Sequence, residues 1–197
     1  MNALELHPCP WAAKEDFYLD YHDNEWGIPC YDSRHLFAML CLEGAQAGLS
    51  WRTILLRRPA YYAAFDDFDP EKMAAYDDAK CAALLENSGI IRNKLKIKAF
   101  ISNAQAYLRI SERQTFADYL WQMVGGNPHI HYFQNLKEIP TQNSLSEAMS
   151  KQLKKDGFRF VGPTICYAFM QSMGMVNDHL TTCYCHPMYQ SLENIVP

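Results

Sequence analysis

The sequence predicts an all-α fold. In most segments of the 197 residues, apolar positions recur with the helical period of 3.6, and residues that start or stop helices flank these segments. The sequence has no alternating strand patterns bounded by turn pairs. Apolar residues make up 49% of the chain and charged residues 20%, which allows a buried core and argues against disorder. We therefore expect one helical domain with eight or more helices.

Polar caps and helix breakers mark the first elements. Asp32 or Ser33 begins a helix that Gly48 ends, and Ser50 caps a second helix that Pro59 stops. A proline in a helix interior removes one backbone hydrogen bond, so we expect the second helix to be short.

The same signals mark the later elements. Asp69 followed by Pro70 is a cap with proline at the first helical position, and Ser144 with Glu147 has the spacing of a capping box. We expect the remaining helices over about 78–87, 92–110, 115–124, 144–156 and 163–173.

The net charge of -4 conceals an asymmetry along the chain. Residues 1–86 carry 7 basic and 15 acidic residues, a net charge of -8, whereas residues 87–197 carry 11 basic and 7 acidic residues, a net charge of +4. Two clusters supply the positive excess: Arg92, Lys94, Lys96 and Lys98, and Lys151, Lys154, Lys155 and Arg159. Such clusters can bind a polyanion, and they can equally be solvated helix faces.

The sequence gives no sign of a membrane or export signal. No run of about 18 apolar residues is present, and the segment MNALELHPCPW lacks the basic and apolar regions of a signal peptide. Seven cysteines are an odd number, which favours free thiols or a metal site over disulfides. We expect a cytoplasmic protein that does not contact a membrane.

Cysteine and histidine occur at both ends of the chain. Cys9 and His22 lie near the start, and His179, Cys183, Cys185 and His186 lie near the end. His179 and Cys183 are four positions apart, so a helical turn would put them on one face. Two thiolates and two neutral imidazoles form a tetrahedral set that suits Zn²⁺. The spacing alone is a weak indication, because the Cys-x₂-Cys pair of zinc fingers is missing. Ordinary core and surface residues remain an alternative.

Glu43 lies in the apolar segment MLCLEGAQAGLSW. A carboxylate there either faces water at a helix end or lines a pocket. Three of the four tryptophans, Trp11, Trp26 and Trp51, lie within residues 9–51, and Tyr18 and Tyr21 lie among them. A pocket that combines an acid with aromatic faces suits a flat, cationic ligand with hydrogen-bond donors. Core packing is the alternative for the tryptophans.

A tight connection at 88–92 separates two expected helices. Gly89 would let backbone N–H groups face outward at the positive end of the second helix dipole, where phosphates bind. Arg92, Lys94 and Lys96 follow at once. This is the pattern of a helix–hairpin–helix phosphate clamp, which holds DNA without reading its sequence. Only one glycine is present, so the motif by itself is weak, and an ordinary αα-hairpin is the alternative.

Five segments together resemble the 3-methyladenine DNA glycosylase I family. They are YHDNEWGIP (21–29), CLEGAQAGLSW (41–51), GIIRNKLKI (89–97), FVGPTICYAFMQSMGMVNDH (160–179) and HLTTCYCHP (179–187). The resemblance runs in order from Cys9 to about Pro187. It implies an all-α helix–hairpin–helix glycosylase fold in one unit with two lobes. The helical core would span about 30–175 with the hairpin at 88–92, and zinc would join the termini, 1–29 and 176–197.

The resemblance also implies roles for single residues. It places a structural zinc ion on Cys9, His22, His179 and Cys183. It places base recognition on Glu43 and Tyr21, stacking on Trp11 and Trp51, and the pocket wall on Trp26. It assigns DNA contacts to Leu49, which would fill the gap in the duplex, and to Gly89, Arg92, Lys94 and Lys96. Ala45 departs from the glutamine of many members, which puts a DNA contact from that side chain in doubt.

The implied chemistry is hydrolysis of a glycosidic bond in alkylated double-stranded DNA. Methylation at N3 makes adenine cationic and a good leaving group, and the base must be flipped out of the stack to be reached. No counterpart of a catalytic aspartate is evident, and Asp118, the nearest, is expected at the surface. We expect a monomeric, monofunctional enzyme with Glu43 as the catalytic-site acid. The alternatives are a non-enzymatic zinc-stabilised DNA-binding module and a small-molecule binder that never meets DNA.

Overall fold

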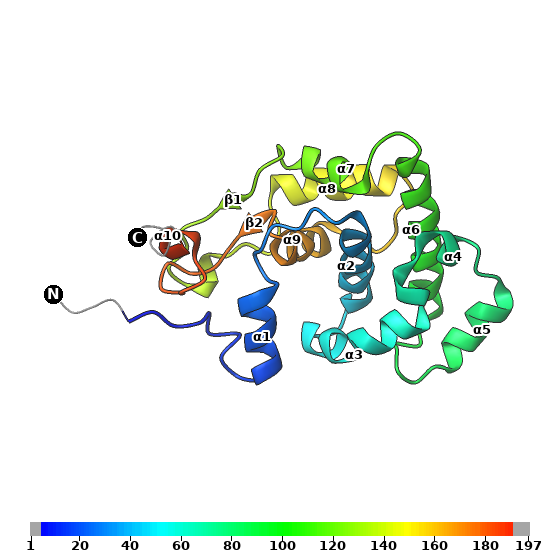
Figure 1. The fold of residues 1–197 in the computed structure, drawn as a ribbon, viewed down its shortest axis with the longest axis horizontal. Coiled ribbons are helices and arrows are strands. Elements are labelled where there is room, and N and C mark those ends of the chain that lie inside the picture. The colour runs from blue at the N-terminus through cyan, green and yellow to red at the C-terminus, as the bar shows by residue number, and fades with distance from the viewer. Residues whose placement is uncertain (1–4, 191–197) are drawn as a thin grey trace, which may run out of the picture. The chain divides into compact units, whose positions relative to one another are not determined.

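The computed structural model of the protein describes residues 5–190 and is mostly helical (Figure 1). Its helices are α1 (Asp16–Asn24), α2 (Ser33–Gln46), α3 (Trp51–Ala64), α4 (Pro70–Ala74), α5 (Asp78–Glu86), α6 (Lys94–Ser111), α7 (Phe116–Met123), α8 (Ser144–Lys155), α9 (Pro163–Ser172) and α10 (Pro187–Gln190). Two short 3₁₀ turns, η1 (Asp66–Phe68) and η2 (Leu136–Glu138), lie between them. Within residues 5–190, no helix has the length and apolarity needed to cross a membrane.

The chain forms two compact units. The helical unit comprises Tyr31–Gly126 and Gln142–Phe169, and the terminal unit comprises the described parts of Met1–Cys30, Asn127–Thr141 and Met170–Pro197. Segment 127–141, which was expected in the helical core, thus belongs with the chain ends.

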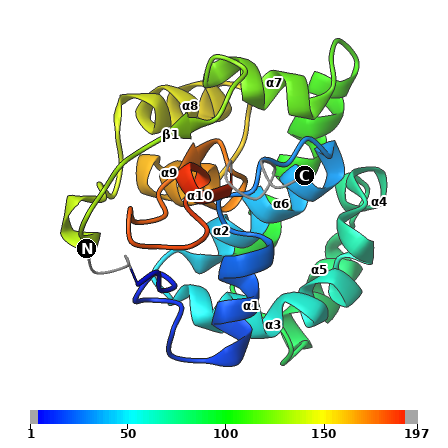
Figure 2. The same cartoon turned by 60° about the vertical axis from the view of Figure 1, so that its left-hand side comes forward.

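The helical unit is built around α6, which packs against α2, α4, α5 and α7 (Figure 2). Aromatic side chains fill the space between these helices. Phe65 and Phe100 lie with ring centroids 4.8 Å apart, and Phe37 lies 5.1 Å from Tyr107. This burial supplies most of the driving force for folding of the unit.

Two helix ends differ from the sequence prediction. Helix α3 continues through Pro59 to Ala64 because Tyr61 and Ala64 of its last turn are buried, and this burial offsets the missing hydrogen bond. The cap of α8 is Asn143, whose side chain accepts from the Ser146 N–H, whereas Ser144 was predicted. The predicted cap of α2 is confirmed, since the Asp32 carboxylate accepts from the His35 N–H at 2.6 Å.

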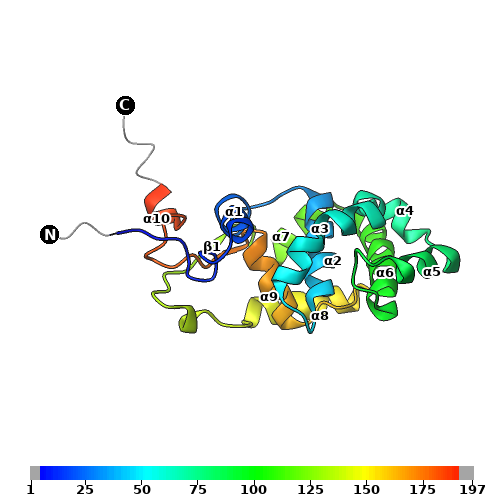
Figure 3. The same ribbon diagram turned by 90° about the horizontal axis from the view of Figure 1, so that it is seen from below.

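The terminal unit contains a small sheet that the sequence did not predict (Figure 1; its strand β1 is also labelled in Figure 3). Strands β1 (His129–Ile130) and β2 (Val176–Asn177) pair in parallel, and His131 N–H donates to Asn177 O at 3.0 Å. Two residues are too few for an alternating pattern, so only pairing between distant segments reveals these strands. Helix α1 was also missed, because it has only nine residues and its N-cap, Glu15, is not one of the usual capping residues.

Candidate metal centre and active-site residues

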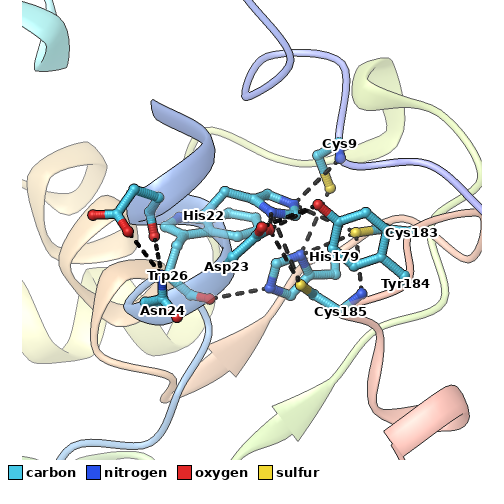
Figure 4. Close-up of polar contacts among 10 residues, drawn as sticks. Cys9, His22, Asp23, Asn24, Trp26, His179, Cys183, Tyr184 and Cys185 are labelled. Carbon is cyan, nitrogen blue, oxygen red and sulfur yellow. Dashed lines mark hydrogen bonds and ion pairs between the residues drawn. The ribbon is translucent and has the colours of Figure 1, made fainter. Parts of the chain in front are cut away.

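Four ligand-type side chains from both ends of the chain converge in the terminal unit (Figure 4). They are Cys9, His22, His179 and Cys183, all buried, with their ligand atoms within 4.8 Å of one another. Cys183 Sγ lies 3.4 Å from His22 Nε2 and 3.5 Å from His179 Nδ1, and Cys9 Sγ lies 3.7 Å from His179 Nδ1. The residues expected to gather do so, and the group could hold a metal ion.

Local structure brings these four residues together. His22 lies on α1, and Gly27 after it has φ +79°. A Cβ at Gly27 would lie 3.0 Å from the His179 ring, so only glycine permits this approach. His7 pairs with Cys183 in an isolated bridge, which places Cys9 beside the C-terminal segment. His179 has no regular secondary structure and Cys183 lies in the isolated bridge, so neither is on a helical turn.

The outer ring nitrogens of both histidines have acceptors. His22 Nδ1 donates to the Asp23 carboxylate at 2.7 Å, and His179 Nε2 donates to the Trp26 carbonyl at 3.0 Å. These bonds leave His22 Nε2 and His179 Nδ1 without a proton, turned toward the thiols. His22 Nε2 accepts the Cys9 N–H at 3.2 Å, in agreement with this tautomer. Both rings are therefore oriented to give a lone pair to the centre of the cluster.

The thiols are also tuned by their neighbours. Hydrogen bonds from Cys185 and Cys9 hold the pKa of the Cys183 thiol well below its usual range. A second group, His22, Asp23 and Cys185, shares His22 with the main cluster. Because its Asp23 carboxylate already accepts from His22, we interpret this group as the outer layer of the same site.

Aromatic rings surround this cluster. Trp26 lies with its ring centroid 4.7 Å from His179 and 5.1 Å from Trp11. Trp11 also lies 6.4 Å from Tyr21, which is buried. The structure thus brings Trp11, Tyr21 and Trp26, three of the predicted pocket residues, into one cluster of the terminal unit.

The other predicted pocket residues lie in the helical unit. Glu43 is 2% exposed and lies near the C-terminal end of the buried stretch 36–45 of α2. Trp51 opens α3 just after the Ser50 cap. Leu49 lies between the two helices and is 40% exposed, next to Gly48 with φ +78°. The side chain of Leu49 is thus exposed at the turn between α2 and α3, and its contact with DNA stays a prediction.

The segment between α5 and α6 forms a tight hairpin. Arg57 Nη1 donates to the carbonyls of Ser88 and Gly89 at 2.8 and 3.1 Å. The N–H of Gly89 donates to Asn87 Oδ1, and the N–H of Ile91 donates to the Tyr61 hydroxyl. These two amides were expected to face outward and be available to a phosphate, but both donate to acceptors of the protein itself. The exposed side chains of Arg92 and Lys94 remain available to a phosphate.

Lys96 does not have the DNA-contacting position expected from the sequence. It is 8% exposed, and its Nζ donates to Ala45 O at 2.7 Å and to Ala47 O at 2.8 Å. The charge run predicted four exposed cations, but helical spacing turns this one toward the end of α2. Asp118 is exposed, as expected, and lies in the first turn of α7, where its carboxylate accepts from the hydroxyl of the cap residue Thr115.

Sequence reasoning missed the acceptors behind the histidines. Asp23 follows His22 directly, and an acid next to a candidate metal ligand is a signal that could have been used. The Trp26 carbonyl has no signal, because every residue has one. Only the folded chain shows which carbonyl faces His179.

The protein is thus a mostly helical chain with a buried Cys₂His₂ cluster and a buried acid in a helix core. A family model described as methyladenine glycosylase matches residues 11–186. The chain is 50% identical over 183 residues to "DNA-3-methyladenine glycosylase 1" of Escherichia coli (strain K12), covering 92% of this chain and 98% of that protein. It is 48% identical to "DNA-3-methyladenine glycosylase" of Haemophilus influenzae, covering 90% and 96%.

Solved structures agree with this relationship. A crystal structure of 3-methyladenine DNA glycosylase I matches with a TM-score of 0.90 and 52% identity, covering 92% of this chain and 100% of that chain. A Staphylococcus aureus structure, described as the structural basis of 3-methyladenine recognition, matches with a TM-score of 0.89 and 36% identity, covering 93% and 98%. The chain belongs to the methyladenine glycosylase family. It is accordingly an enzyme of the glycosylase class, which hydrolyses N-glycosyl bonds.

Proposed function

We propose that this protein removes 3-methyladenine from alkylated double-stranded DNA by hydrolysing the N-glycosidic bond. The observation that carries the proposal is the buried carboxylate of Glu43, within a chain whose relatives are named for this reaction. A desolvated carboxylate attracts a cationic base with N–H donors more strongly than it attracts neutral adenine.

The proposed reaction is monofunctional. The flipped cationic base leaves as neutral 3-methyladenine when its bond to the sugar C1′ breaks and the bond electrons stay on the base. Water supplies the hydroxyl that ends on C1′ and releases its other proton to the solvent. Glu43 and Tyr21 would hydrogen-bond the base, Trp11 and Trp51 would stack on it, and Trp26 would form part of the wall. These shared roles rest on the resemblance; burial supports those of Glu43 and Tyr21.

We propose that the helical unit binds the DNA backbone. The α5–α6 hairpin would act as the helix–hairpin–helix element, with Gly89 in its turn and with Arg92 and Lys94 meeting phosphates. Leu49 would fill the space left by the flipped base. Support comes from the exposed side chains of Arg92, Lys94 and Leu49. Such contacts would be independent of sequence.

The Cys₂His₂ cluster is proposed to hold one structural Zn²⁺. In a tetrahedral site with ordinary Zn–S and Zn–N bonds, sulfur and nitrogen ligands lie about 3.5 Å apart. The three sulfur–nitrogen separations of 3.4, 3.5 and 3.7 Å agree with this value. Two thiolates and two neutral imidazoles neutralise the ion and fill its four positions, so none is left for a catalytic water. When bound, the metal would stabilise the terminal unit.

The test is release of free base from methylated duplex DNA, resolved by chromatography. We expect the protein to release 3-methyladenine without nicking the strand and without forming an adduct that borohydride traps. We also propose that the protein is a monomer and acts in the cytoplasm. A protein that binds DNA and releases no base would instead be the non-enzymatic binding module. Unchanged base release by a variant whose hairpin no longer binds DNA would contradict the proposed role of the hairpin.

A further inference from the structure

A buried lysine connects the hairpin to the end of the helix that carries Glu43. Lys96 lies in the first turn of α6, and its Nζ reaches the carbonyl oxygens of Ala45 and Ala47 at 2.7 and 2.8 Å. Neither distance leaves room for a water molecule between the groups. All the residues concerned belong to the helical unit.

The acceptors are carbonyls at the C-terminus of α2. These carbonyls lack helical partners, and the negative end of the helix dipole favours a cation there. Ala47 is the C-cap, and the chain then turns through Gly48, where Leu49 N–H donates to Gln46 O at 2.6 Å. The ammonium group thus binds both the last turn of α2 and the first residue of the Leu49 turn (47–50). Burial lowers the pKa of Lys96, as expected for a desolvated amine.

The other end of this connection is equally fixed. The Asn93 side chain caps α6 by accepting from the N–H groups of Leu95 and Lys96 at 2.9 and 3.1 Å. Upstream, Arg57 holds the hairpin carbonyls of Ser88 and Gly89. Movement of the Leu49 turn against the hairpin would therefore break two charge-assisted hydrogen bonds in a buried place.

We propose that Lys96 is a positioning residue that fixes the Leu49 turn relative to the hairpin, so that duplex DNA held by the hairpin meets Leu49 at one set distance. The inference rests on the proposed function. Lys96 itself touches no DNA. Its two exposed neighbours in the charge run, Lys94 and Lys98, lie on other sides of α6.

The test compares Lys96→Met with Lys94→Met in the full chain. Methionine keeps much of the length of lysine and removes the charge and the donors. At saturating methylated duplex, we expect Lys96→Met to lower the single-turnover rate of base release about tenfold or more. Its salt dependence of DNA binding should equal that of the wild type. Lys94→Met should reduce the slope of log K against log salt by about one, because it loses a phosphate contact.

A double-mutant cycle with Leu49→Ala separates positioning from simple stabilisation. If Lys96 acts through the Leu49 turn, Lys96→Met should cost less than about twofold once Leu49 is gone. An equal loss in both backgrounds would overturn the proposal, as would a reduced salt slope for Lys96→Met. Lys96→Arg keeps the charge and displaces the donors, so it should lower the rate of base release less than Lys96→Met does. This reduction should also disappear in the Leu49→Ala background. If Lys96→Met does not fold, the double-mutant cycle of Lys96→Arg with Leu49→Ala tests the proposal in its place.

The two proposals fail in different ways. A wild-type protein that releases no 3-methyladenine overturns the proposed function. A wild-type protein that releases it, with additive effects of Lys96 and Leu49 substitutions, overturns only the role of Lys96.

Discussion

The Nδ1 of His22 lies 2.7 Å from a carboxylate oxygen of Asp23, the next residue of α1. This bond selects the tautomer that turns Nε2 toward the two thiols. The Tyr184 hydroxyl donates to the same carboxylate at 2.9 Å and fixes it in turn. The candidate metal centre therefore has an ordered outer layer as well as four ligands.

Replacing Asp23 with Asn should weaken zinc binding by about 10- to 100-fold, because an uncharged amide orients the imidazole less firmly and makes it a weaker donor. Competition with a chromophoric chelator measures the affinity. Asp16→Asn is the matched control, since Asp16 is exposed on the same helix. Equal zinc affinity in the two variants would show that the carboxylate does not support the metal.

Loss of a ligand should affect stability more than catalysis. In Cys183→Ala the metal site loses one thiolate, and the folding free energy that metal binding contributes is reduced. We expect a clearly lower Tm, with the remaining folded protein still active, and chelator treatment should lower the Tm of the wild type only. Purified protein without zinc by elemental analysis would contradict the proposed cofactor.

Glu43→Gln should lose about 10- to 100-fold in affinity for free 3-methyladenine, corresponding to a lost charge-assisted hydrogen bond of about 1.5–3 kcal/mol. Glutamine is nearly isosteric, so the fold should survive. Tyr21→Phe should cost less, since it removes a neutral hydroxyl. Calorimetric titration of free base measures both. Wild-type affinity combined with lost excision would make Glu43 a catalytic base, not a recognition group.

Two glycines with similar backbone angles should respond differently to alanine. At Gly125 (φ +80°) an added Cβ would have no atom within 4 Å, so Gly125→Ala should cost only about 1–2 kcal/mol of backbone strain. At Gly174 (φ +64°) a Cβ would lie 2.3 Å from backbone atoms of Ile28 and Pro29. Gly174→Ala should therefore cost more than about 4 kcal/mol or prevent folding. Urea unfolding of the two variants measures the difference, and equal midpoints would contradict the steric argument.

Lys94 and Arg92 are the exposed cations next to the hairpin. Replacing both with Ala should reduce affinity for duplexes of any sequence and lower the salt slope by about two. Fluorescence anisotropy over a range of salt concentrations measures the slope. An unchanged salt slope would indicate that the second basic cluster, Lys151–Arg159, makes the phosphate contacts instead.

Local chemistry allowed much of the fold to be predicted. The cap of α2 could be predicted because it depends only on near neighbours: the Asp32 carboxylate accepts from the N–H of His35, three residues later. The candidate metal ligands could be listed by residue type, but the choice of Cys9, His22, His179 and Cys183 rested on the family resemblance, because their spacing alone is a weak indication. The strand pair β1–β2 could not be predicted from the sequence, because each strand has two residues and its partner lies more than forty positions away.

The sequence by itself determined the helical class, most helix starts and the inventory of reactive side chains, because these depend on neighbours within one or two turns. The tertiary structure alone decided what those side chains do. Lys96 belongs by sequence to an exposed charge run, yet it bonds to Ala45 and Ala47 about fifty residues earlier. The Trp26 carbonyl orients His179, a residue 153 positions away. Burial and hydrogen bonding depend on which distant segments meet, and that is settled only when the chain has folded.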